Sequence, residues 1–205
     1  MNSFTPKELK LLQKLNTPAK VQDYLNSLKF NFELKGATLK SPLLVLRAGN
    51  AHCIEGAILG AYILSRYSNL DHKPYILHLK TIKEDYEHVI APFKVGDRWG
   101  ALSKTNHAVL RYREPVYKSI RELVMSYFHE YYLENGHKTL RSYSGLLNLN
   151  IFEKGWETSE QDLWGIDEEL DKIKHYDIVP KSYIKKLRKV DKIEIKAGDI
   201  PEYKK

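Results

Sequence analysis

The residue that could do chemistry most directly is Cys53, the single cysteine in a sequence of 205 residues. A polar loop ending in Gly49-Asn50 runs into an apolar segment, residues 57–64, that reads as a buried helix. Cys53 is therefore expected in or just before the first helical turn, where unpaired amide groups and the helix dipole favour negative charge. The pKa of a thiol is lowered there, which makes it a nucleophile near neutral pH. Many lone cysteines are instead small core residues, so the histidines must decide between the two readings.

His88 is the histidine best placed to serve such a thiol. Two strand-like runs on either side of a Gly96-Asp97 turn predict a hairpin. With the turn there, His88 begins one strand and lies opposite about residue 104 or 105 on the other. Residues 103–106 are thus able to reach the imidazole ring, whereas Asp97 at the far tip is not.

The order of these pieces resembles the transglutaminase-like, or papain-like, cysteine superfamily. Its members carry a cysteine at the start of a buried helix and a histidine on a following strand. An Asp on the next strand commonly follows a glycine-then-tryptophan segment. The matching pieces are Asn50-Ala51-His52-Cys53-Ile54-Glu55-Gly56-Ala57, Glu87-His88-Val89 and Gly96-Asp97-Arg98-Trp99. The resemblance covers approximately residues 45–110 and implies that Cys53 is the nucleophile and His88 its base and acid.

The chain departs from the family's pattern at the third residue. Where the family has Asp, this sequence has Ser103, which can accept a hydrogen bond from the distal His88 nitrogen but brings no negative charge. Asn106 is the other candidate, because an asparagine orients the histidine in papain-like proteases. Asp85 and Glu87 could supply charge from the His88 end. The sequence leaves the third role open.

Further residues are candidates for lining the cleft or the oxyanion hole, namely Asn50, His52, Glu55, Trp99 and His107. The backbone N–H of Cys53, with a donor from the loop of residues 47–52, is the expected oxyanion hole. His52 and His107 are alternative bases, and Glu55 is either a cleft carboxylate or a charge at the helix N-terminus. One cysteine, and histidines without tight ligand spacing, argue against a zinc site. We expect no metal and no cofactor.

The composition narrows the function classes. The net charge is +7, but the excess is concentrated in lysines and arginines after residue 180, a pattern typical of a solvated face or loose tail. No nucleic-acid motif accompanies it, so nucleic acid is disfavoured as a partner. No apolar run reaches the ~20 residues of a membrane span. A single cysteine excludes an internal disulfide, and the first residues lack a signal pattern, which favours a cytoplasmic protein.

The expected fold is an α+β domain of residues 1–180, with its core in 45–135, followed by a basic segment, 181–205. A central cysteine helix, residues 51–67, packs on a small antiparallel sheet, with helices flanking it at both ends. Helices are expected after the capping signals Thr5-Pro6 and Thr17-Pro18, from Pro115 to about Gly136, and after Ser159. Residues 75–80 read as a strand, 43–46 as an extended piece, 108–113 as a continuation of the sheet, 142–152 as irregular and 199–205 as frayed.

These features together predict a transglutaminase-like cysteine enzyme. Cys53 would form a thioacyl intermediate with a peptide or small amide, followed by hydrolysis or acyl transfer. Hydrolysis is the favoured outcome, because the chain is short and shows no calcium-loop motif. The alternative is a catalytically degraded member of the same fold that binds an acidic protein partner. The serine at position 103 and the lysine-rich end favour that alternative.

Overall fold

The computed structural model describes residues 3–67 and 73–204. Its helices are α1 (Pro6–Lys14), α2 (Pro18–Ser27), α3 (Pro42–Ala48), α4 (Cys53–Ser65), α5 (Ile120–Phe128), α6 (Trp164–Lys172), α7 (Lys181–Ile184) and α8 (Lys192–Gly198), with short 3-10 turns η2 (Leu149–Ile151) and η3 (Trp156–Thr158). Its strands are β1 (Lys29–Phe30), β2 (Asn50–Ala51), β3 (Tyr75–Lys80), β4 (His88–Val95), β5 (Arg98–Leu102), β6 (Arg113–Tyr117), β7 (Ser142–Ser144), β8 (Leu147–Asn148) and β9 (His175–Asp177).

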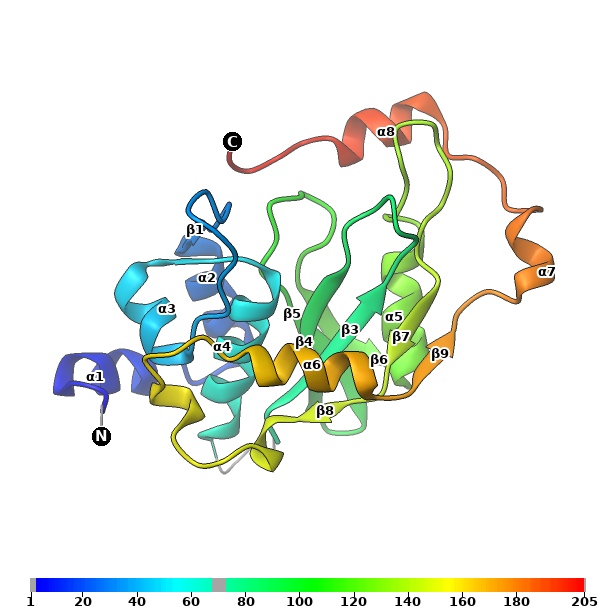
Figure 1. Ribbon diagram of the computed structural model, residues 1–205. Helices are drawn as coiled ribbons and strands as arrows, with labels where there is room; N and C mark the ends of the chain where they lie inside the picture. Colours follow the sequence, from blue (N-terminus) through cyan, green and yellow to red (C-terminus); the bar gives the residue numbers. More distant parts are fainter. Residues whose placement is uncertain (1–2, 68–72, 205) are drawn as a thin grey trace.

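The main sheet is antiparallel and lies beside a group of helices formed mostly by the first third of the chain (Figure 1). Its strand order is β6-β5-β4-β3-β7-β9, and β8 pairs with another part of β3. A separate parallel pair joins β1 to β2 just before α4. An antiparallel sheet with several helices is the α+β class that the sequence predicts.

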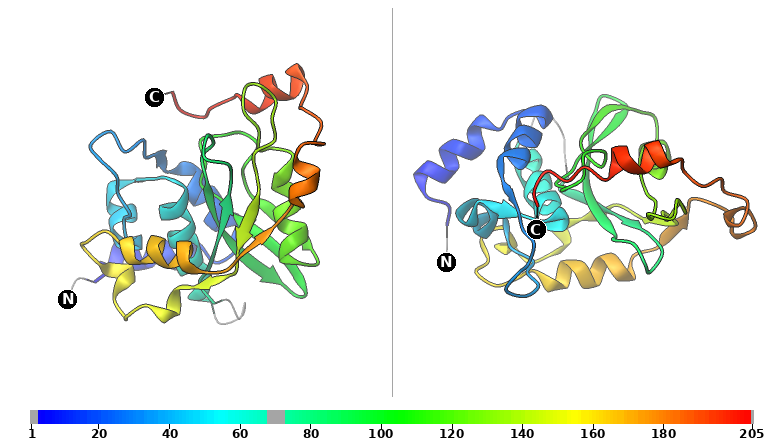
Figure 2. Two further views of the ribbon diagram at one scale, coloured as in Figure 1. Left: turned by 45° about the vertical axis from the view of Figure 1, so that its right-hand side comes forward. Right: turned by 90° about the horizontal axis from the view of Figure 1, so that it is seen from above.

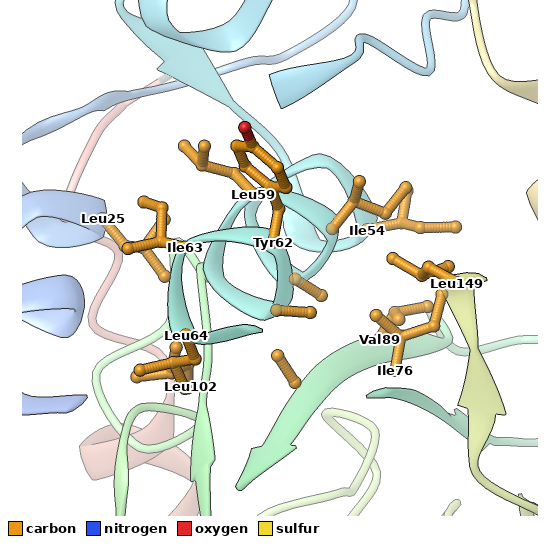
Figure 3. Packing of buried hydrophobic residues seen from close by; sticks show 14 of the residues in the cluster. Leu25, Ile54, Leu59, Tyr62, Ile63, Leu64, Ile76, Val89, Leu102 and Leu149 are labelled. Atoms are coloured by element: carbon orange, nitrogen blue, oxygen red, sulfur yellow. The ribbon is translucent and has the colours of Figure 1, made fainter. Parts of the chain in front are cut away.

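The sheet is covered on both faces, because neighbouring residues of a strand point to opposite sides. Ile76 of β3 and Val89 of β4 pack with α4, whereas the adjacent Leu77 and Ile90 belong to a second core cluster with α5. Figure 3 shows how apolar side chains surround α4. A helix that is apolar on nearly every side is stable only inside such a core, so the position of its first turn is firmly determined.

The hairpin that carries His88 has the expected register. Val95 pairs with Arg98 across the Gly96-Asp97 turn, and Ala91 pairs with Leu102 at the other end of the ladder. Gly96 has a positive φ of 60°, which a glycine adopts without strain. The register brings the start of β4 beside the residues that follow β5.

The capping signals predict the first two helices correctly. Thr5 and Glu8 form the reciprocal capping box at the start of α1, and Thr17 caps α2. The extended piece expected at residues 43–46 is wrong, because those residues lie in α3. Ser41 caps this helix and Pro42 begins it, while Gly49 ends it in the left-handed conformation. The same start signal thus occurs three times.

Five other expectations about the elements are wrong. Residues 108–112 do not continue the sheet, which resumes only with β6 at Arg113. Pro115 lies inside β6, an edge strand that tolerates a residue without an N–H, and the helix begins only after the Ser119 cap and ends at Phe128. Residues 142–152 contain β7, β8 and η2. Ser159 follows η3, and α6 begins five residues later, at Trp164. The last residues up to 204 are not frayed but cross the molecule above the sheet (Figures 1 and 2).

Gly56 offers a test of how closely α4 approaches the segment after β5. A Cβ at position 56 would overlap the Cβ of Lys104. We expect Gly56→Ala to lower the free energy of unfolding by about 1–3 kcal/mol, because both contacting atoms belong to rigidly held parts of the chain. Denaturant unfolding measures this.

Gly165 of α6 is the matched control, since it is exposed and a Cβ there would meet no atom within 4 Å. Gly165→Ala should leave stability unchanged or raise it by about 0.5–1 kcal/mol. Equal effects of the two substitutions would contradict the close approach.

Candidate functional site

A cavity of about 510 Å³ opens at the first turn of α4. It is bounded by the segment around β1, the residues before β4, those after β5, the turn after α5 and part of the C-terminal segment. Its polar lining includes His52, Cys53, His88, Lys104, Asn106 and Tyr131. The cavity therefore gathers most of the residues that the sequence singles out, from elements far apart along the chain.

Cys53 is the first residue of α4 and is partly exposed. Burial raises the pKa of its thiol, but hydrogen bonds and charge from His52 and His88 outweigh that effect and lower the pKa to about 5. The helix N-terminus acts in the same direction. A thiol with this pKa is ionised near neutral pH, as the sequence predicts.

His88 is buried, and its orientation is determined by Ser103. The Nε2 atom of His88 lies 2.8 Å from Ser103 Oγ, and the hydroxyl of Ser103 donates to the carbonyl oxygen of Leu110 at 2.5 Å. A serine hydroxyl has one proton. Because that proton is given to Leu110, Ser103 accepts from Nε2–H, and Nδ1 is the nitrogen that faces the thiol.

Gln22 holds Ser103 in place from α2. Its side-chain nitrogen donates to the Ser103 carbonyl at 2.8 Å, and its oxygen accepts from the Ser103 N–H at 2.9 Å. The sequence motifs do not single out Gln22. One signal in the sequence could have identified Gln22. It lies on the same buried face of α2 as Val21 and Leu25, which are apolar. A polar side chain on such a face must find a partner.

His52 precedes Cys53 and contacts the thiol from the other side. Its Nε2 lies 2.9 Å from the carbonyl oxygen of Thr38, which accepts the hydrogen bond. Glu33 and Glu55 place carboxylate oxygens 3.5 and 3.6 Å from the same nitrogen. Burial lowers the pKa of His52, but the interactions with Cys53, Glu55 and Thr38 outweigh it and raise the pKa to about 9. The Cys53 thiol thus interacts with two imidazoles.

Glu55 has no exposed surface and is the centre of a hydrogen-bond network. Its oxygens accept from the Thr38 hydroxyl, the N–H groups of Lys40 and His52, and the Asn31 side chain, and it forms an ion pair with Lys40 at 3.2 Å. Burial raises its pKa, but the charge of His52 and these donors lower it overall. Glu55 is therefore more than a helix-terminal charge, because it also holds His52.

Asn106 and His107 line the cavity but contact the C-terminal segment. Both ends of the Asn106 amide bind the backbone of Tyr203, at 2.8 and 3.0 Å, whereas the ring of His88 binds Ser103. His107 forms a backbone bridge to Pro201. An Arg111–Glu202 ion pair of 2.8 Å fastens the segment further. These contacts explain why the last residues are ordered against the domain.

Asn50 and Trp99 lie outside the described lining of the cavity. The side chain of Asn50 accepts from Lys40 Nζ at 2.8 Å. Trp99 is near the tip of the hairpin, where Lys94 Nζ lies 5.2 Å from its ring centroid. Among the described residues, no group of three or more His, Cys, Asp or Glu side chains could hold a metal ion, and no helix could span a membrane.

The pH dependence of Cys53 alkylation tests whether His52 contributes to the low thiol pKa. Because alkylation follows the thiolate, the rate should be nearly constant from pH 6 to 8 and fall below about pH 5, whereas an ordinary thiol gains about tenfold per unit over that range. We expect His52→Gln to move the midpoint upward. His137→Gln, at an exposed position, should leave it unchanged. A midpoint unaffected by His52→Gln would contradict this role.

Comparison with known proteins identifies a family that matches the part of the chain containing this site. Tubulinyl-Tyr carboxypeptidase 1 of Mus musculus is 27% identical to it over 119 residues, which is 52% of this chain and 32% of the relative. The chain thus spans about a third of the length of that relative. The sequence profile of the Vasohibin family matches residues 5–149, which include α1 to β8, Cys53, His88 and Ser103. The chain belongs to the Vasohibin family.

Proposed function

We propose that this protein is a cysteine peptidase of the transglutaminase-like kind, which hydrolyses an amide bond through a thioacyl intermediate on Cys53. The observation that carries the proposal is the contact of the Cys53 thiol with two imidazoles, one of them oriented by Ser103. A nucleophile, a base and a group that orients the base are the parts that nucleophilic catalysis requires.

The reaction follows from these positions. The Cys53 thiolate attacks the carbonyl carbon, and the tetrahedral intermediate collapses when His88 Nδ1 donates its proton to the leaving amine. A water molecule, deprotonated by the same nitrogen, then attacks the thioester and releases the acid. The N–H of Cys53, the first residue of α4, supplies a donor for the negative charge that develops on the carbonyl oxygen.

A neutral serine suffices as the third residue in this arrangement. In serine proteases, a carboxylate stabilises an imidazolium that forms only during the reaction. Here the thiolate itself provides the negative charge beside His88, and the pKa of the thiol is already about 5. Ser103 need only fix the tautomer and direction of the ring, which its bond to Leu110 enables it to do.

The name of the mouse relative indicates removal of a C-terminal residue, and we extend this carboxypeptidase activity to the present chain as part of the proposal. A free substrate carboxylate needs a cationic partner in a cavity with a low dielectric constant. Lys104 supplies a cation in the lining, one residue after Ser103, although its Nζ now donates to the carbonyl of Leu28 at 2.5 Å. Phe30, Phe32 and Tyr132 give the same cavity aromatic walls for an apolar terminal side chain.

The alternative, a binding protein with a catalytically degraded site, predicts that Cys53 is no longer an activated nucleophile. A degraded site has no reason to keep a lowered thiol pKa or a buried Ser103 that is bound through its backbone and its side chain. The basic residues after position 180 remain available for an acidic protein partner, and that partner is compatible with a peptidase that acts on an acidic protein segment. We therefore favour the enzyme.

A short peptide ending in tyrosine with a free carboxylate tests the proposal, with release of tyrosine measured by mass spectrometry. Cys53→Ala should abolish release while changing the free energy of unfolding by less than about 2 kcal/mol. Ser103→Ala should lower kcat by about 100-fold, because the His88 ring loses its orienting partner.

The same peptide with an amidated C-terminus is the control for the carboxypeptidase part. It should be cleaved poorly, since the carboxylate is missing. Equal cleavage of both peptides would contradict the carboxypeptidase assignment but not the peptidase. Activity that survives Cys53→Ala would contradict the nucleophile itself.

A further inference from the structure

A buried tyrosine in the cavity has a hydroxyl without a hydrogen-bond partner. Tyr131 is only 4% exposed and lines the same cavity as Cys53 and His88. Within residues 3–67 and 73–204, its hydroxyl oxygen is the buried side-chain polar atom that lacks a partner. A donor buried in this way costs free energy, and nearly all buried polar groups in folded proteins are paired. The absence of a partner points to a group that binds there during function.

The neighbouring tyrosine shows that the fold can satisfy such a hydroxyl. Tyr127, four residues earlier and on α5, is also buried, and its hydroxyl donates to the carbonyl of Arg111 at 3.2 Å. Tyr131 lies just after the end of α5 and lines the cavity, and its buried hydroxyl has no such acceptor. The two tyrosines have the same chemistry but different surroundings.

The groups around Tyr131 hold it in place but leave its hydroxyl free to donate. Its backbone carbonyl accepts from the N–H of Thr139 at 3.0 Å. The nearby Asp85 already receives a hydrogen bond on each carboxylate oxygen, one from the Thr139 hydroxyl and one from the N–H of Tyr86. The tyrosine is therefore anchored by its backbone, and the adjacent carboxylate is already paired.

Tyr131 shares the cavity with the proposed nucleophile and interacts with it electrostatically. Burial raises the pKa of Tyr131, and the negative charges of Cys53 and Asp85 raise it further, so the phenol keeps its proton as a donor. The sulfur of Cys53 is nevertheless not its hydrogen-bond partner. When Sγ bonds to a carbonyl carbon, the oxygen on that carbon lies two bonds from the sulfur and becomes a new acceptor in the cavity that Tyr131 lines.

We propose that Tyr131 is a catalytic residue whose hydroxyl donates a hydrogen bond to the oxygen of the carbonyl that Cys53 attacks. As the S–C bond forms, the π pair of the carbonyl moves to that oxygen, which becomes anionic. A fixed donor in a buried site stabilises this charge more than it stabilises the neutral carbonyl, and so it accelerates the reaction. The assignment deepens the proposed peptidase function and rests on it.

Tyr131→Phe removes the donor and keeps the ring. We expect kcat for the tyrosine-ending peptide to fall on the order of 100-fold, with little change in KM. The melting temperature should stay the same or rise, because the variant no longer buries an unpaired hydroxyl. Tyr127→Phe is the matched control, which should keep kcat and melt a few degrees lower, because it loses a satisfied hydrogen bond.

A peptide aldehyde gives a readout that needs no turnover. Its carbonyl carbon bonds to Cys53 Sγ, the thiol proton ends on the oxygen, and that oxygen takes the place of the oxyanion. Tyr131→Phe should bind the aldehyde at least tenfold more weakly than the wild type, and Tyr127→Phe should bind it equally well. Wild-type affinity and unchanged kcat in Tyr131→Phe would overturn the assignment, as would a change in KM alone. If the wild type binds the aldehyde with this dependence yet cleaves no peptide, the peptidase proposal fails while the donor role stands.

Discussion

The single proton of the Ser103 hydroxyl is the constraint on which the site depends. Because Leu110 accepts that proton, Ser103 can only accept from His88, and the ring is held with Nε2 toward the serine and Nδ1 toward the thiol. Gln22 fixes the serine backbone from a different helix. The direction of the His88 imidazole is thus determined by two neutral side chains and a carbonyl, without a carboxylate.

His52 and Glu55 form a second network of specific interactions next to the Cys53 thiol. Glu55 is fully buried and saturated with donors, and it positions His52 by accepting from its backbone N–H and placing charge beside its ring. A buried carboxylate is stable only when it is paired and hydrogen-bonded in this manner. The paired His52 and Glu55 therefore lie on the His52 side of Cys53, where the raised pKa of His52 favours the ionised thiol.

The features that the sequence predicts well depend on local pattern. Cys53 at a helix start follows from the polar loop and the apolar run after it, and the register of the His88 hairpin follows from the Gly96-Asp97 turn. The same register brings Ser103 close enough to contact the His88 ring. Each of these needs only residues close together along the chain.

The features that the sequence does not predict depend on contacts between distant segments. Gln22 and Ser103 are 81 residues apart, and the hydrogen bonds between Asn106 and Tyr203 join residues 97 positions apart. Pro115 shows the same limit, since only the pairing of β6 at a sheet edge decides that this proline belongs to a strand rather than a helix. Tyr127 and Tyr131 are four residues apart along the chain, and only the hydrogen bonding of their buried hydroxyls distinguishes them.

Nitrogen-15 NMR of labelled histidine is the most direct test of whether Ser103 orients the His88 ring. With the His88 signals assigned by their loss in His88→Gln, we expect a proton on Nε2 and a nitrogen shift that changes in Ser103→Ala. A His88 ring with a bare Nε2 and a proton on Nδ1 alone would contradict the hydrogen bond from Nε2–H to Ser103. In that case the ring could not accept a proton from Cys53, and the structure would not describe a working cysteine site.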